Sequence, residues 1–119
     1  MDSKQPPHKN LKAWQYSIEL VRDIYWVTKK FPKEEMYGLT SQMRRAAVSI
    51  PSNIAEGAIG RSKKHFANYL LNSVGSLAEL DTQIEIAHML GYINNDDKIG
   101  VIEKLNRVKA LSLGLKNSL

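Results

Sequence analysis

The chain has 119 residues, no cysteine, a net charge of +5 and a sequence pI of about 9.5. This length fits one domain, and the absence of cysteine excludes disulfides, thiolate metal sites and a cysteine nucleophile. No apolar run is long enough to span a bilayer, and residues 1–10 lack the apolar segment of a signal peptide. We therefore expect a cytoplasmic protein with no membrane partner. The excess positive charge suggests an acidic partner such as nucleic acid, although solvated helical surfaces often carry it too.

The first predicted helix follows a short polar segment. We expect residues 1–10, which include Pro6 and Pro7, to form a flexible N-terminal arm. Beyond them apolar residues recur at steps of three and four, which is typical of one face of an α-helix. The helix covers residues 11–30 and stops before Pro32. Its predicted core stripe is Leu11, Trp14, Ile18, Val21, Tyr25 and Thr28, widened by Ile24 and Phe31.

The second predicted helix begins at Leu39, ends near Gly57 and contains a proline. Pro51 has no backbone N–H, so the carbonyl of Ala47 loses its usual partner. We expect the helix to continue through Pro51 with a kink. Polar side chains near the kink are expected to re-satisfy the backbone, namely Ser49, Ser52 or Asn53.

Two longer helices complete the pattern. Ser62 is a good N-cap for the third helix, which Gly91 closes, and Asn94 or Asn95 caps the fourth. No segment alternates as a strand does, and short connections favour up-down-up-down packing. The predicted fold class is therefore an all-α antiparallel four-helix bundle, with residues 11–119 as its one domain.

Some apolar residues lie outside the predicted core stripes. Surplus apolar surface of this kind usually belongs to a partner interface, so we expect a homo-oligomer. The residues concerned are Tyr16, Leu20, Val27, Ile86, Met89 and Leu113.

Catalytic motifs are sparse. Glu85 and His88 form one Glu-x-x-His pair, whereas di-iron bundles need two such pairs and further glutamates. The hydroxyls near Pro51 have no nearby base to activate them, and there is no Walker loop or dinucleotide fingerprint. We expect no enzymatic activity, no metal and no cofactor. A metal-dependent oxidase is the alternative that rests on Glu85 and His88 alone.

One side of the second helix is polar without a mixture of lysine and glutamate. A solvated face is one interpretation, and a contact surface for another subunit or for nucleic acid is the other. The short amides and hydroxyls, beside the pair Arg44–Arg45, favour the contact surface. This polar face consists of Gln42, Arg45, Ser49, Asn53 and Glu56.

The start of the third helix carries Arg61, Lys63 and Lys64. The helix dipole disfavours cations there, which hints at an anion between them. An up-down bundle brings further lysines to the same end. A lysine-rich solubility patch is the alternative interpretation. The complete predicted nucleic-acid-binding set is Lys9, Lys12, Arg44, Arg45, Arg61, Lys63, Lys64 and Lys116.

The segment 49–57, Ser-Ile-Pro-Ser-Asn-Ile-Ala-Glu-Gly, is distinctive, with Tyr37-Gly38-Leu39 before it and Leu90-Gly91-Tyr92-Ile93 after it. It resembles the four-helix-bundle proteins encoded in intervening sequences of bacterial 23S rRNA genes. The accessory variability determinants of diversity-generating retroelements are similar. The resemblance covers about Leu11 to Leu115. Small departures, such as Ser17 and Ser73 in place of small apolar residues, concern packing.

This resemblance implies an up-down bundle that assembles into a ring, typically a homopentamer. The retroelement relatives bind nucleic acid and a reverse transcriptase through a basic surface. The resemblance supplies no catalytic residue, but it singles out a characteristic polar set: Arg44, Arg45, Ser49, Asn53 and Glu56. We therefore predict a ring-forming accessory protein that binds RNA or DNA. The alternative is a homo-oligomeric scaffold that binds only protein, such as a reverse transcriptase.

Overall fold

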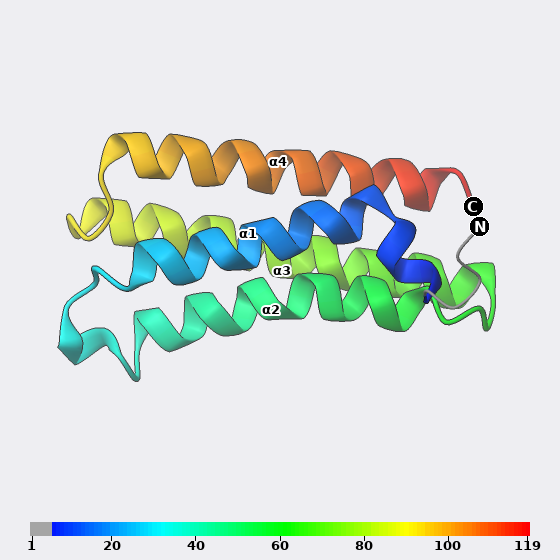
Figure 1. The fold of residues 1–119 in the computed structure, drawn as a ribbon, viewed down its shortest axis with the longest axis horizontal. Helices are drawn as coiled ribbons and strands as arrows, with labels where there is room; N and C mark the ends of the chain where they lie inside the picture. The colour runs from blue at the N-terminus through cyan, green and yellow to red at the C-terminus, as the bar shows by residue number, and fades with distance from the viewer. Residues whose placement is uncertain (1–5) are drawn as a thin grey trace.

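The computed structural model describes residues 6–119, and the predicted arm before Pro6 lies outside the described residues. Four helices run alternately up and down and pack side by side (Figure 1). Each helix contacts its neighbour in the chain, and α1 also contacts α4. The predicted antiparallel four-helix bundle is confirmed. The elements are η1 (Pro7–Asn10), α1 (Lys12–Thr28), η2 (Lys33–Glu35), α2 (Leu39–Gly57), α3 (Lys63–Met89) and α4 (Asn95–Asn117), where η denotes a 3-10 helix.

Side-chain caps start the two long helices as the sequence predicts. The Ser62 hydroxyl accepts a hydrogen bond from the His65 amide at 3.0 Å, and the Asn94 amide oxygen accepts one from the Asp97 amide at 2.7 Å. Gly91 follows α3 with φ +79°, a left-handed conformation that glycine adopts without strain. Among residues 6–119, no helix is both long and apolar enough to cross a membrane.

The end of the predicted arm is attached to the bundle. Pro7–Asn10 form η1, which contacts α1 and α2. The His8 ring meets the edge of Trp14 with centroids 5.2 Å apart, and the Gln15 side chain donates to the Lys9 carbonyl at 2.8 Å. These contacts hold residues 7–10 against α1.

Helix α2 continues through Pro51, as predicted. Three polar side chains near the proline bond backbone carbonyls of the preceding turn. Ser49 donates to the carbonyl of Ala46, Ser52 to that of Val48 and Asn53 to that of Ser49, at 2.7–2.8 Å. Among residues 6–119, no side chain is hydrogen-bonded to the Ala47 carbonyl. The polar side chains therefore bond the carbonyls of Ala46 and Val48, which flank the Ala47 carbonyl that loses its partner at Pro51.

The predicted core stripe of α1 is confirmed in part, because Ile24, Thr28 and Phe31 are buried. Ile18 and Tyr25 are 42% and 40% exposed, whereas Leu20 and Val27, which we assigned to surplus surface, are buried in the core. Helix α1 carries apolar residues on two adjacent sides, and the side with the smallest residues approaches the other helices most closely. The buried side of α1 and the turn after it is Ala13, Ser17, Leu20, Ile24, Val27, Thr28 and Phe31.

Of the other apolar residues that we assigned to surplus surface, two are exposed and two are half-buried. Ile86 is 39% exposed and Met89 is 74% exposed, so both lie on the outer side of α3. Tyr16 and Leu113 are half-buried. Exposed apolar surface therefore exists, but different residues provide most of it.

Two fully buried serines allow a stability test. Ser73 donates to the Ile50 carbonyl at 3.0 Å, whereas the Ser112 hydroxyl has no hydrogen-bond partner among the described residues. We expect Ser73→Ala to lower the free energy of unfolding by about 1 kcal/mol and Ser112→Ala to be neutral or stabilising, because only the first loses a bond. Urea unfolding of both variants checks this. An equal loss in Ser112→Ala would show that Ser112 has a partner, such as buried water.

Candidate nucleic-acid interface

Six basic residues gather at one end of the bundle, which we call the basic end. The start of α1, the connection from α2 to α3 and the end of α4 all lie there (Figure 1). Five of the six side chains are exposed and Lys116 is half-buried. Within residues 6–119 none of them forms an ion pair, although the exposed Glu56 lies at the same end. The basic end consists of Lys9, Lys12, Arg61, Lys63, Lys64 and Lys116.

The connection that carries Arg61, Lys63 and Lys64 is short and closely packed. Gly57, the last residue of α2, lies so close to α3 that a Cβ there would be 2.8 Å from the Cβ of Tyr69. Gly60 then takes the left-handed conformation, with φ +88°. These constraints place the three cations around the first turn of α3, where the helix dipole attracts anions.

His65, in the first turn of α3, connects this helix to α2. The Nε2 atom of His65 lies 3.1 Å from the Glu56 carbonyl, and its ring packs on Tyr69 with centroids 4.7 Å apart. A cavity of about 330 Å³ lies between the end of α2, the start of α3 and Leu119. Lys63 lines this cavity, so the basic end includes a hollow as well as a convex surface.

Arg44 and Arg45 do not belong to the basic end. Arg45 precedes Gly57 by about three turns, so it lies roughly 18 Å away along α2. The Arg44 Nε atom donates to the Thr28 hydroxyl at 2.9 Å, and its guanidinium lies 4.6 Å from the centre of the Tyr25 ring. Arg44 therefore joins α2 to α1, whereas Arg45 is exposed. The eight predicted residues form a group of six and a separate pair.

The predicted polar face of α2 is partly used inside the subunit. Ser49 and Asn53 are half-buried, and the Ser49 hydroxyl, which donates to the Ala46 carbonyl, accepts a hydrogen bond from the hydroxyl of Ser76 on α3 at 2.7 Å. Gln42, Arg45 and Glu56 are exposed. Ser49, at the centre of this face, thus contributes to packing between α2 and α3, which sequence spacing alone does not reveal.

Glu85 and His88 are bonded to α4. Glu85 accepts from the Lys98 Nζ atom at 2.8 Å, and His88 Nε2 lies 2.6 Å from the Asn95 amide oxygen. Within the part of the chain that the structure describes, no three His, Asp or Glu side chains could hold a metal ion together. The alternative of a metal-dependent oxidase gains no further ligands there.

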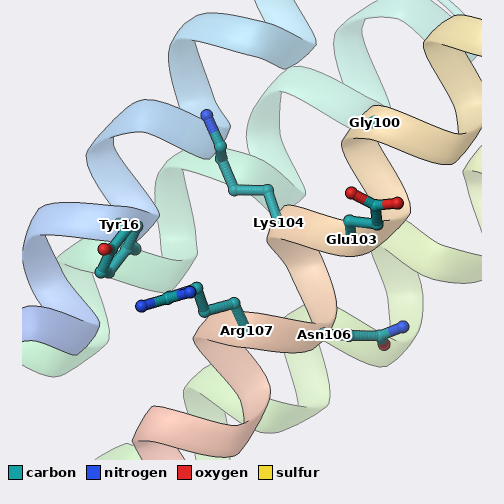
Figure 2. A pocket seen from close by; sticks show the side chains of 6 residues that line it. All are labelled: Tyr16, Gly100, Glu103, Lys104, Asn106 and Arg107. Carbon is teal, nitrogen blue, oxygen red and sulfur yellow. The ribbon is translucent and has the colours of Figure 1, made fainter.

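Lys104, on the α1–α4 side, is ion-paired, unlike the cations of the basic end. The Lys104 Nζ atom lies 2.9 Å from an Asp23 oxygen and 3.3 Å from a Glu19 oxygen. The hydrogen bond to Asp23 raises the pKa of Lys104. Arg107 points toward Tyr16 (Figure 2), and its guanidinium lies 4.5 Å from the ring centre. The hollow of about 550 Å³ beside them therefore presents cations that already have partners.

Tyr92, at the end opposite the basic end, provides a pH test. Its hydroxyl donates to a Glu35 oxygen at 3.0 Å, and this bond raises the pKa of the phenol above its ordinary 10.0. A raised pKa means that the folded chain holds the proton more tightly. The stabilisation is complete below pH 10 and is lost as pH rises through the folded-state pKa. We expect Tyr92→Phe to reduce the alkaline loss of stability, measured by thermal unfolding from pH 8 to 11. An unchanged profile would contradict this role.

The fold and this surface together define a class: a small antiparallel helical bundle with a basic end. The chain belongs to the family of 23S rRNA-intervening sequence proteins, whose model matches residues 9–114. The fold is similar to that of a protein of unknown function from the S23 ribosomal protein family of Bacteroides thetaiotaomicron. The two share 19% identity with a TM-score of 0.79, over 88% of this chain and 95% of that one. No curated protein matches the chain.

Proposed function

We propose that this protein is a non-enzymatic, ring-forming helical bundle that binds RNA or DNA through the phosphate backbone at its basic end. The observation that carries the proposal is the concentration of basic side chains at that end. Its six cations have no ion-pair partner among the described residues, whereas several cations elsewhere are paired. Six cations at one end, without an ion pair among residues 6–119, favour an anionic ligand.

The geometry favours contact with phosphates over contact with bases. Lysine and arginine side chains around the start of a helix reach the phosphate backbone, and contacts of this kind carry no sequence information. The first turn of α3 adds a favourable dipole for phosphate. We therefore expect binding with little sequence preference and with a strong dependence on salt concentration.

The test is a titration of labelled RNA and DNA of equal length with the protein over a series of salt concentrations. We expect both to bind, with log affinity falling linearly as log salt rises. No binding of either nucleic acid at low salt would overturn the proposal.

Assembly into a ring multiplies weak phosphate contacts, because each subunit repeats the basic end. Exposed apolar side chains such as Ile18, Tyr25 and Val48 support self-association. We expect light scattering to give a homo-oligomer, with a mass of five times the 13.5 kDa of the chain for the pentamer. A monomer at micromolar concentration would contradict this expectation.

A scaffold that binds only protein is the second candidate. An apolar groove between α1 and α2 favours it, since this groove is a surface for protein and not for phosphate. In that case the basic end would serve solubility. A protein that forms oligomers but binds neither RNA nor DNA would support the scaffold.

A further inference from the structure

His65 lies in the first turn of α3, beside the cations of the basic end. Its side chain is half-buried, so solvent reaches part of the ring. The Nε2 atom lies 3.1 Å from the carbonyl oxygen of Glu56. A carbonyl oxygen only accepts hydrogen bonds, so Nε2 carries a proton in this contact. Nδ1 is therefore the atom that takes up a proton when the imidazole becomes charged.

Protonation of His65 leaves its contact with α2 intact. The Nε2–H group donates to the Glu56 carbonyl in both charge states, and among residues 6–119 no group is hydrogen-bonded to Nδ1. The charged imidazole therefore offers a new N–H donor and a new positive charge without a change in the fold. An anionic ligand at the basic end can use both.

Charges of both signs act on the His65 ring. The end of α2 favours a positive charge there, because a helix C-terminus and the Glu56 carboxylate are both negative. The start of α3 and the cations beside it disfavour one. Helix α3 packs against α2 and α4. The charged and titratable groups that these helices and the connection from α2 to α3 bring to this end are Glu56, Arg61, Lys63, Lys64, Tyr69 and Lys116.

A phosphate bound at the start of α3 changes this balance. It offsets the charge of the cations and places negative charge close to the imidazole, so it stabilises the protonated ring. Such coupling is reciprocal. If bound phosphate favours proton uptake, then proton uptake strengthens phosphate binding by the same factor.

We propose that His65 takes up a proton when the basic end binds phosphate, so that RNA and DNA bind more tightly at mildly acidic pH. This inference rests on the proposed function and adds the regulation of its site by pH. The coupling is local, because the hydrogen bond to Glu56 holds the ring at the start of α3 in both charge states.

The test is the affinity for a labelled oligouridylate, measured from pH 8 to pH 5.5, a range in which histidine is the side chain that normally changes charge. Uracil has no group that titrates in this range. We expect the affinity of the parent protein to rise by roughly fivefold or more, the lower end of typical couplings between two ligands. An affinity that does not change with pH would overturn the inference, whereas no binding at any pH would overturn the proposed function itself.

The salt dependence supplies a second readout, which a purely structural role of His65 would not move. A protonated imidazole adds one phosphate contact, so the slope of log affinity against log salt should steepen by roughly 0.7 per bound subunit at pH 5.5. An equal slope at pH 8 and pH 5.5 would contradict a direct contact between His65 and phosphate.

Two variants fix the charge at this position. His65→Gln keeps an N–H donor for the Glu56 carbonyl but stays neutral, so its affinity should change by less than about twofold over the range. His65→Lys is charged throughout, and we expect its affinity at pH 8 to approach that of the parent at pH 5.5. Circular dichroism checks that both variants fold. A rise in the affinity of His65→Gln as large as that of the parent would overturn the inference.

The chain has three histidines, so the other two provide matched controls. His8 lies in η1 at the same end with its ring against Trp14, and His88 lies at the opposite end, bonded to Asn95. His8→Gln and His88→Gln each remove one titrating charge, and we expect both to keep the rise in affinity on acidification. If either lost as much of the rise as His65→Gln, then net charge or another histidine would set the pH dependence, and the assignment to His65 would be wrong.

Discussion

Replacing Arg61, Lys63 and Lys64 together by glutamine is expected to weaken binding to RNA and to DNA and to flatten its dependence on salt. Each phosphate contact contributes about 0.9 to the slope of log affinity against log salt for B-DNA and about 0.7 for single strands. Loss of three contacts should therefore lower the slope by roughly 2 to 3 per bound subunit. Fluorescence anisotropy at several salt concentrations measures both the affinity and the slope.

A matched variant separates local contact from net charge. Lys29, Lys30 and Lys33 lie at the opposite end of the bundle, where Lys30 pairs with Asp97 at 3.4 Å, and their replacement by glutamine lowers the net charge by the same amount. We expect this control to keep most of the affinity and the slope. Equal losses in both triple variants would show that net charge alone drives binding.

The basic-end variant should fold as the parent does. Its three side chains are exposed and form no ion pair among the described residues, and the dipole at the start of α3 disfavours their charge. Circular dichroism and light scattering check fold and assembly. If the variant binds as tightly as the parent, the basic end is a solvated surface. The scaffold then becomes the leading candidate, unless replacement of Arg44 and Arg45 abolishes binding.

Local signals were sufficient for the helix boundaries. Ser62 and Asn94 cap α3 and α4 through bonds to amides three residues later, and such contacts depend only on nearby sequence. Gly91 closes α3 for an equally local reason. Four amphipathic helices with short connections have few ways to bury their apolar sides, so the bundle follows.

The rotation of α1 could not be predicted in this way. Its true core side begins with Ala13 and Ser17, which hydrophobicity patterns rate below Trp14 and Ile18. Small residues are buried there because they allow close packing, a property of the neighbouring helices and not of α1. The same limit applies to Arg44, whose partners Thr28 and Tyr25 lie on another helix.

The segment 49–57 is explained largely by the contact between α2 and α3. Ser49 reaches Ser76, Ile50 offers its carbonyl to Ser73, and Gly57 lies against Tyr69. The residues on which the family resemblance rests therefore support the bundle itself. This explains how a distinctive motif can occur without an accompanying catalytic group.

Gly57→Ala is expected to lower the free energy of unfolding by about 1 to 3 kcal/mol, the usual cost of overpacking a close contact. A Cβ at this position would lie 2.8 Å from the Cβ of Tyr69 and 3.3 Å from the carbonyl oxygen of Phe66. Neither atom belongs to the end of a flexible side chain, so α2 and α3 would have to separate. Alanine usually gains up to about 1 kcal/mol over glycine inside a helix, and this gain is too small to offset the clash.

Gly100→Ala is the matched control for this prediction. Gly100 lies inside α4, and a Cβ there would meet nothing within 4 Å. We expect it to stabilise the protein by roughly 0.5 to 1 kcal/mol, because alanine loses less backbone entropy on folding. Urea unfolding of the parent and both variants, at one protein concentration so that assembly affects all three equally, measures the difference. A lower free energy of unfolding in Gly57→Ala and a higher one in Gly100→Ala would show that the close contact between α2 and α3 requires glycine at position 57. A stabilised Gly57→Ala would show that α2 and α3 can separate at little cost.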